Sequence, residues 1–279
     1  MRALVLSLRE ALKVRTFAVG SAILATVVIA AVLAPVLAPH TYQEMNIPQA
    51  LTGPSRQYPF GTDNYGRCVF SRVIYGSRIA LEVGFIVVVI ETLIGVALGL
   101  IAGYYGGAVD RVVSFVTDMT WALPPQVLAL AIVTALGPSL NNVVIAIAVV
   151  SWAQFARIIR SKTQALKNTP YVEAARALSE SDLSIMLRYI LPNTMGAVIV
   201  LTTLALPSAI LSTTALSFLG LGAQPPQPDW GVILKDGISY MARAPWISIF
   251  PGLAIVWTVL GFNLLGEGLR DVLDPRLKV

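Results

Sequence analysis

The sequence VGFIVVVIETLIGVALGLIAG, at residues 83–103, decides the fold class of this chain. Glu91 is its one charged residue, and a helix of about 20 residues rising about 1.5 Å each crosses the roughly 30 Å hydrocarbon core of a bilayer. The rest of the chain is similar: of 279 residues, 56% are hydrophobic and 13% charged, against about 25% charged in a soluble domain. We therefore predict an all-α integral membrane protein.

Charged residues separate further apolar runs, so the sequence predicts six transmembrane helices. The runs cover residues 17–38, 83–103, 112–136, 137–156, a stretch between 189 and 228, and 244–266. The first run follows four basic residues and has two interpretations, a signal peptide or a retained anchor. We favour the anchor, because the run is longer than the about 7–15 apolar residues of a signal peptide.

The distribution of Lys and Arg predicts the orientation. Fourteen of the 20 basic residues fall on one side of the six predicted spans, and the positive-inside rule places that side in the cytoplasm. The net charge of +5 then reflects topology and lipid contact, with no sign of nucleic-acid binding. The predicted organisation is a cytoplasmic N-terminal segment (1–16), an anchor (17–38), an extracytoplasmic segment (39–78), a core of five helices (79–268) and a cytoplasmic tail (269–279).

Several kinds of chemistry lack the residues they need. His40 and Cys68 are the single His and the single Cys, so the chain has neither a disulfide nor a Cys/His metal site. No Lys follows a Gly, which excludes a P-loop for nucleotide phosphates. We predict no catalytic residue, no metal ligand and no enzyme activity.

Residues 157–192 form a long loop between the fourth and fifth predicted spans. Thr169-Pro170 is typical of a helix start, and 171–178 reads as a short helix. Residues 179–182 interrupt it, and a second helix follows until Leu191-Pro192. Its apolar stripe is predicted to be Leu183, Leu187 and Ile190, with Met186 beside them.

This loop has two interpretations, an amphipathic segment on the membrane surface or a docking element for a cytoplasmic protein. Its basic composition fits both. The small residues Ala174, Ala175 and Ala177 favour docking, because lipid contact would prefer bulky apolar side chains.

The loop also resembles a known motif. Glu173-Ala-Ala175, Ser179 and Leu191-Pro192 are similar to the EAA loop of ATP-binding-cassette importer permeases. Further stretches resemble the C-type permease of dipeptide, oligopeptide and nickel importers, over roughly residues 15 to 278. They are Phe60–Arg67 with Ser71-Arg72, Gly103–Gly107, Ala122–Pro124, Leu216–Gly222 with Gln224–Pro226 and Trp230-Gly231, and Phe262–Pro275.

The resemblance implies an importer subunit for a peptide or related small solute, in the inner membrane of a bacterium or archaeon. Implied partners are a second homologous permease, two cytoplasmic ATPases that bind ATP and Mg²⁺, and an extracytoplasmic solute-binding protein, besides membrane lipid. This chain itself would hold no cofactor. The residues implied to couple to the ATPase are Glu173, Ala174, Ala175, Leu178, Ser179, Asp182 and Leu187.

Three positions depart from the family pattern. The family usually has Gly where this chain has Ser179, often Ile at Tyr189, and Asp at Cys68. Because Ser can cap a helix, we expect Ser179 to preserve the break by capping the second helix.

Four residues are candidates for the solute path or a gate. Glu91 is predicted near the middle of the second span, either as a functional carboxylate or as a Glu hydrogen-bonded to a neighbouring helix. Asp118 either pairs with Arg111 or lines an inner gate. Pro124 and Pro125 predict a kink that is either a gate hinge or an ordinary bend.

Residues 40–75 and 224–230, rich in Pro and Gly, are either a dock for the binding protein or a cap over the helix ends. The rival function is a secondary transporter or channel working alone. Such proteins often show inverted repeats and charged midplane sites. The sequence has no clear repeat and a single midplane carboxylate, which favours the importer subunit.

Overall fold

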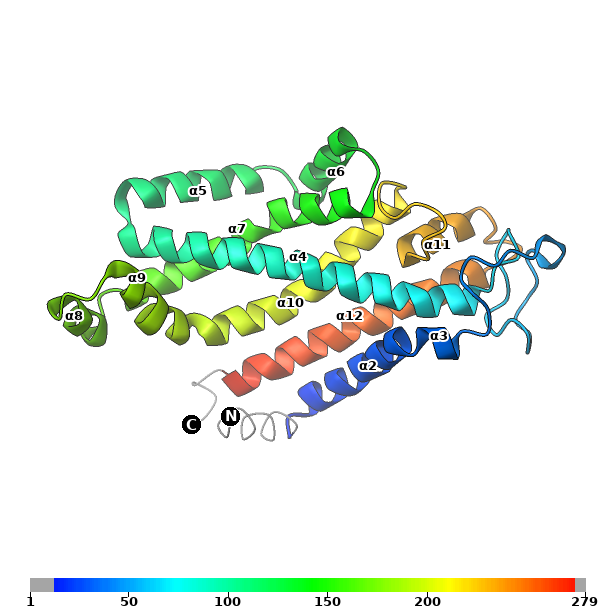
Figure 1. The fold of residues 1–279 in the computed structure, drawn as a ribbon, viewed down its shortest axis with the longest axis horizontal. Coiled ribbons are helices and arrows are strands. Elements are labelled where there is room, and N and C mark those ends of the chain that lie inside the picture. The colour runs from blue at the N-terminus through cyan, green and yellow to red at the C-terminus, as the bar shows by residue number, and fades with distance from the viewer. Residues whose placement is uncertain (1–12, 274–279) are drawn as a thin grey trace.

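The computed structural model describes residues 13–273, and within them the chain is built from helices. Five long helices run along the long axis of the molecule (Figure 1). The elements in chain order are α2 (Arg15–Val32), α3 (Ala34–Leu37), η1 (Ile47–Gln49), α4 (Val69–Tyr105), α5 (Gly107–Trp121), α6 (Pro125–Leu136), α7 (Leu140–Leu166), α8 (Pro170–Ala177), α9 (Asp182–Ile185), the π-helical turn η2 (Met186–Ile190), α10 (Leu191–Phe218), α11 (Trp230–Ile238) and α12 (Trp246–Leu273). The all-α prediction is confirmed.

Five helical segments are long and apolar enough to cross a membrane, and a sixth span exists if a bent pair counts as one. That pair is α5 and α6, which meet at 86°. The predicted span over 112–136 is thus a broken one, and the break lies at the predicted Pro124-Pro125 kink. Pro125 lacks a backbone N–H and disfavours the helical conformation at Pro124, whose ψ of 129° turns the chain out of the helix.

Two helices are longer than the apolar runs from which they were predicted. The run at 83–103 lies inside α4, which begins at Val69 within the predicted outer segment. The run at 137–156 lies inside α7, which continues to Leu166 and takes up the first part of the predicted loop. Hydropathy marks only the apolar part of a helix, whereas these extensions carry Arg side chains that find partners on other elements.

Small residues allow α4 and α7 to pack closely. A Cβ on Gly95 would lie 2.3 Å from the Phe155 Cβ, and one on Gly99 would lie 2.7 Å from the Ala156 carbonyl oxygen. Glycine at these positions lets the two helix backbones approach, as is common in membrane bundles. The pair forms the frame on which the loop after α7 rests.

The first predicted span corresponds to α2 and α3, and α2 packs along α12. The Trp257 indole of α12 donates a hydrogen bond to the Thr26 hydroxyl of α2 at 3.0 Å. Most of the predicted N-terminal segment, and residues 274–279 of the predicted tail, lie outside the described residues.

Candidate functional site

The loop between α7 and α10 lies at one end of the bundle, beyond the ends of α4 and α7 (Figure 1, left). It consists of α8, a short break and α9, which continues through η2 into α10. The predicted sequence of helix, break and helix is therefore present, and α8 begins at Pro170 after Thr169.

The inner face of α8 is anchored to the bundle. Val172 is 0% exposed and Ala175 is 2% exposed. Both pack in one apolar cluster with Leu100 and Tyr104 of α4 and Ile159 of α7. Ala175 is thus a packing residue, because its small side chain lets α8 sit closely on α4 and α7.

The outer face of the loop carries exposed leucines among its polar residues. Leu178 is 78% exposed, Leu183 62% and Leu187 49%. The predicted apolar stripe of Leu183, Leu187 and Ile190 does not form one face, because Leu183 and Leu187 lie outward and Ile190 inward. Ile190 is buried, but the other buried residues are Ile185 and Met186. Because η2 is a π-helical turn, its side chains advance by a smaller angle than in the α-helix that the stripe assumed.

The break between α8 and α9 does not use Ser179 as a cap. Ser179 has φ +59°, the left-handed conformation that favours glycine, which agrees with the Gly usual in the resembled motif. Ser181 is the cap instead, since its hydroxyl oxygen accepts a hydrogen bond from the Ser184 N–H at 3.3 Å. The expectation for Ser179 is corrected: the residue tolerates a strained backbone rather than capping.

Asp182 faces the bundle. Its carboxylate accepts a hydrogen bond at 2.6 Å from the Tyr104 hydroxyl of α4. The Arg176 guanidinium lies 5.4 Å from the centre of the same tyrosine ring. Asp182 and Arg176 therefore tie α9 and α8 to one side chain of α4, whereas Glu173 and Ala174 remain exposed on α8.

Glu180 and Tyr189 brace the break from the other side. The Tyr189 hydroxyl donates to one Glu180 oxygen at 2.6 Å, and the Ser184 hydroxyl donates to the other at 2.7 Å. These two hydrogen bonds hold the pKa of the Glu180 carboxyl below its usual value. The departure at Tyr189 thus supplies a hydroxyl that the more usual Ile would lack.

The predicted end of the second helix at Leu191-Pro192 is wrong. The helix continues from Asp182 to Phe218. Pro192 lacks an N–H and its ring would clash with the carbonyl four residues earlier in a regular α-helix. The wider turn of η2, directly before it, accommodates the proline without ending the helix.

The path and gate candidates lie apart from this loop. Asp118 pairs with Arg157 of α7, with 2.9 Å between Oδ1 and Nη2, so the predicted pairing with Arg111 is wrong. Arg111 lies two turns away on the same helix, whereas α7 packs alongside α5. The predicted kink at Pro124 and Pro125 is present as the right-angle bend, and Glu91 is buried in α4.

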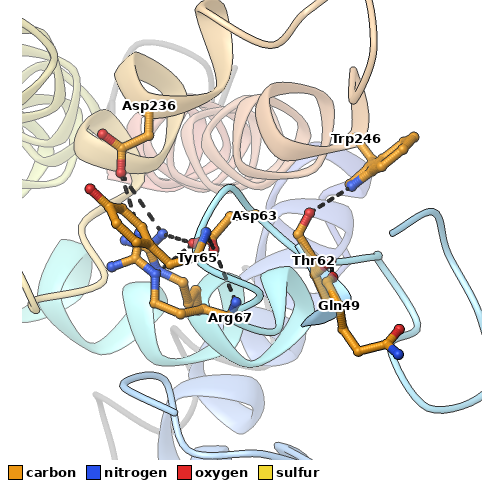
Figure 2. Close-up of polar contacts among 8 residues, drawn as sticks. Gln49, Thr62, Asp63, Tyr65, Arg67, Asp236 and Trp246 are labelled. Atoms are coloured by element: carbon orange, nitrogen blue, oxygen red, sulfur yellow. Dashed lines mark hydrogen bonds and ion pairs between the residues drawn. The ribbon is translucent and has the colours of Figure 1, made fainter. Parts of the chain in front are cut away.

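A buried ion network at the opposite end of the bundle was missed from the sequence (Figure 2). Asp63, in the loop before α4, accepts from Arg67 Nε and from Arg72 Nη1, both at 2.6 Å. Asp236 of α11 lies 3.6 Å from Arg67 Nη2 and 3.9 Å from Arg72 Nη1. Burial raises the pKa of Asp236, while Arg72 and Arg67 act in the opposite direction. The network joins the outer loop, α4 and α11.

A second set of contacts holds the same outer loop. The Trp246 indole N–H of α12 donates to the Thr62 carbonyl at 3.0 Å, and the Thr62 hydroxyl donates to the Gln49 carbonyl (Figure 2). The sequence signal for these contacts is the run Phe60–Arg67, which also carries the resemblance to importer permeases. Its acidic and basic residues pair with each other, and with Arg72 nearby, rather than facing water.

Comparison with known proteins identifies the family. Residues 95–279 match the family described as the binding-protein-dependent transport system inner membrane component. The chain belongs to this family of permeases. Residues 6–54 match the N-terminal transmembrane domain of oligopeptide transport permease C. The resemblance to importer permeases is thereby confirmed.

Individual relatives agree with this assignment. The permease is 45% identical over 260 residues to the dipeptide transport system permease protein of Alkalihalophilus pseudofirmus, covering 93% of this chain and 86% of the relative. It is 46% identical over 226 residues to the glutathione transport system permease proteins of Pectobacterium atrosepticum and Escherichia coli, covering 81% of this chain and 75% of each relative. These proteins are transport permeases, so this chain is a multi-pass membrane permease of an importer.

Proposed function

We propose that this permease is one of two homologous membrane subunits of an ATP-driven importer for dipeptides or related small peptides. Two cytoplasmic ATPases that bind ATP and Mg²⁺ drive it, and an extracytoplasmic protein delivers the solute. The chain lies in the inner membrane with both termini in the cytoplasm. The names of the dipeptide and glutathione relatives support a peptide solute over nickel.

One observation carries the coupling part of this proposal. The loop is fixed to α4 and α7 through Val172, Ala175 and Asp182, yet it presents Leu178, Leu183 and Leu187 outward. An anchored helical element with exposed leucines on its outer face suits transmission of a movement from an ATPase. Shifting a two-state equilibrium from 1:99 to 99:1 takes about 5.5 kcal/mol, which only a stiff contact transmits.

The test replaces one exposed leucine. Leu178→Glu places a charge at the centre of the proposed ATPase contact without touching the packed inner face. We expect a loss of about 2 kcal/mol, or roughly 30-fold, in affinity for the ATPases, as for a central interface residue. The measurement is the amount of ATPase that co-purifies with the tagged permease in mild detergent.

The matched control is Ile47→Glu, an exposed apolar residue of η1 at the opposite end of the molecule. It should leave ATPase co-purification unchanged. If Leu178→Glu retains the ATPases and ATP-dependent uptake at the wild-type level, the loop is not the coupling site. A charge at Ala175 is a weaker test, because it also disrupts the packing of α8.

A further inference from the structure

A polar cavity of about 150 Å³ lies between α4, α7 and α10. Half of its lining residues are polar, and they are Glu91, Ser151, Gln154, Ser208 and Ser212. The remaining walls are apolar, among them Phe155 and Leu204. A cluster of hydroxyl, amide and carboxylate groups inside an apolar bundle forms a place where a polar group can be held away from lipid.

Glu91 is the one ionisable residue in this cavity. Its side chain is 3% exposed, and no ion pair among residues 13–273 involves it. A buried carboxylate is costly without a partner. An ionisable residue inside the membrane is accordingly a functional candidate. The Ser151 hydroxyl of α7 hydrogen-bonds to this carboxyl, so the group that the cavity lacks is one with a positive charge.

A second cavity, of about 170 Å³, adjoins the first. Ser151 and Ser212 line both cavities. The rest of the second cavity is mainly apolar and includes Leu130, Val150 and Leu216. Its wall also contains Pro125, at the bend between α5 and α6. The cavity with the carboxylate and the apolar cavity beside the candidate hinge are therefore neighbours that share a wall.

We propose that Glu91 is a binding residue for the ammonium group of a solute in transit, whose apolar side group occupies the adjoining cavity. The proposal rests on the proposed importer function and narrows its solute to molecules that carry a free amino group and an apolar body. Ser151 and Ser212, shared by the two cavities, would hydrogen-bond the polar atoms between these parts.

The test is uptake by the complete importer in proteoliposomes, with the binding protein saturated by either of two peptides. The peptides are leucyl-leucinamide and its N-acetyl form, which differ in the ammonium group. We expect Glu91→Gln to lower the uptake ratio of free to acetylated peptide by about tenfold, the equivalent of one charge-assisted hydrogen bond. Binding-protein-stimulated ATPase activity should remain at the wild-type level.

Glu82→Gln is the matched control, because Glu82 is an exposed carboxylate on the same helix. It should leave the ratio unchanged, and Glu91→Asp should retain most of the discrimination. An unchanged ratio in Glu91→Gln, or an equal loss of both peptides, would overturn the inference. Failure of the wild-type importer to take up either peptide would instead overturn the proposed function.

A second measurement uses the unaltered chain, so it does not depend on a variant that folds. Dicyclohexylcarbodiimide modifies carboxyl groups in apolar surroundings, and mass spectrometry counts the adduct at Glu91. Leucyl-leucinamide should reduce this adduct, whereas the acetylated peptide should not. Equal modification with both peptides, or no modification of Glu91 at all, would contradict the inference.

Discussion

At the scale of single residues, polar contacts hold the loops at the two ends of this permease against its helices. Asp63 binds two arginines, and Asp236 lies near both of them across the boundary to α11. Asp182 binds Tyr104 of α4. Each of these side chains sits at one end of the bundle, where it orients a loop against the helices.

Removing Asp63 tests the outer network. In Asp63→Asn, Asp236 is the one carboxylate that remains near Arg67 and Arg72. These two arginines are 3% and 1% exposed. We expect a loss of about 3–5 kcal/mol in the free energy of unfolding, because buried charge becomes uncompensated. The measurement is thermal and denaturant unfolding of the permease in detergent.

The double variant Asp63→Asn with Arg72→Met removes one charge of each sign and should recover part of the lost stability. Glu44→Gln, at an exposed carboxylate of the outer segment, is the control and should have no effect. A stable Asp63→Asn variant would show that the network does not hold the outer loop.

The Glu180 carboxyl provides a pH-dependent test of the coupling loop. Its pKa is lowered by hydrogen bonds from Tyr189 and Ser184. The contribution of this carboxylate to stability is therefore present above the unfolded pKa and is lost as the pH falls through the folded pKa. We expect Tyr189→Phe to raise the Glu180 pKa toward its usual value, as measured by carbon-13 NMR titration of a labelled glutamate.

The comparison of the two proteins can contradict this prediction. If Glu180 titrates identically in the wild type and in Tyr189→Phe, Tyr189 does not brace the break.

At the scale of elements, the bend between α5 and α6 distinguishes this bundle from six simple spans. The two helices meet at 86°, with Pro124 in an extended conformation between them. Helices shaped by proline in this way can reorient at low cost, because the hydrogen bonds at the bend are already absent.

Replacing one proline tests whether the bend is built into the sequence. Pro125→Ala restores an N–H and lets Pro124 adopt helical dihedral angles. We expect α5 and α6 to straighten, so that spin labels at exposed Val112 and Leu136 move apart toward the about 36 Å of a continuous helix. The measurement is double electron–electron resonance in lipid nanodiscs.

Pro207→Ala provides the comparison, since Pro207 lies inside α10 and should leave this distance unchanged. If Pro125→Ala also leaves the distance between the spin labels unchanged, the bend is maintained by packing of α6 against α7 and not by the proline.

At the scale of the whole molecule, the two ends of the bundle differ in construction. One end carries α8 and α9 with three exposed leucines, and the other carries the loop before α4 together with α11 (Figure 1). The proposed orientation places the first end in the cytoplasm and the second outside it.

Site-directed labelling tests this orientation. Cys68 is buried, so Cys68→Ser supplies a background without native thiols. In that background, Leu178→Cys should react with a membrane-impermeant maleimide only in inside-out vesicles, and Glu44→Cys only in intact cells. Reaction of both cysteines from the same side would contradict the six-span topology.

The amino-acid sequence alone predicts the class of protein, the positions of the apolar helices and the family. These follow from hydropathy and from local motifs, which depend on neighbouring residues along the chain. The break after α8 was predicted for the same reason, although its details were not: Ser179 adopts the left-handed conformation and Ser181 forms the cap.

The tertiary structure is needed to tell which side chains face inward and which charges pair. The outward position of Leu183 and Leu187, the pairing of Asp118 with Arg157, and the approach of Asp236 to Arg67 and Arg72 all depend on packing between distant segments. A charged residue looks the same in sequence whether water or another helix surrounds it. Its partner is chosen by the geometry with which helices pack, and hydropathy does not record that geometry.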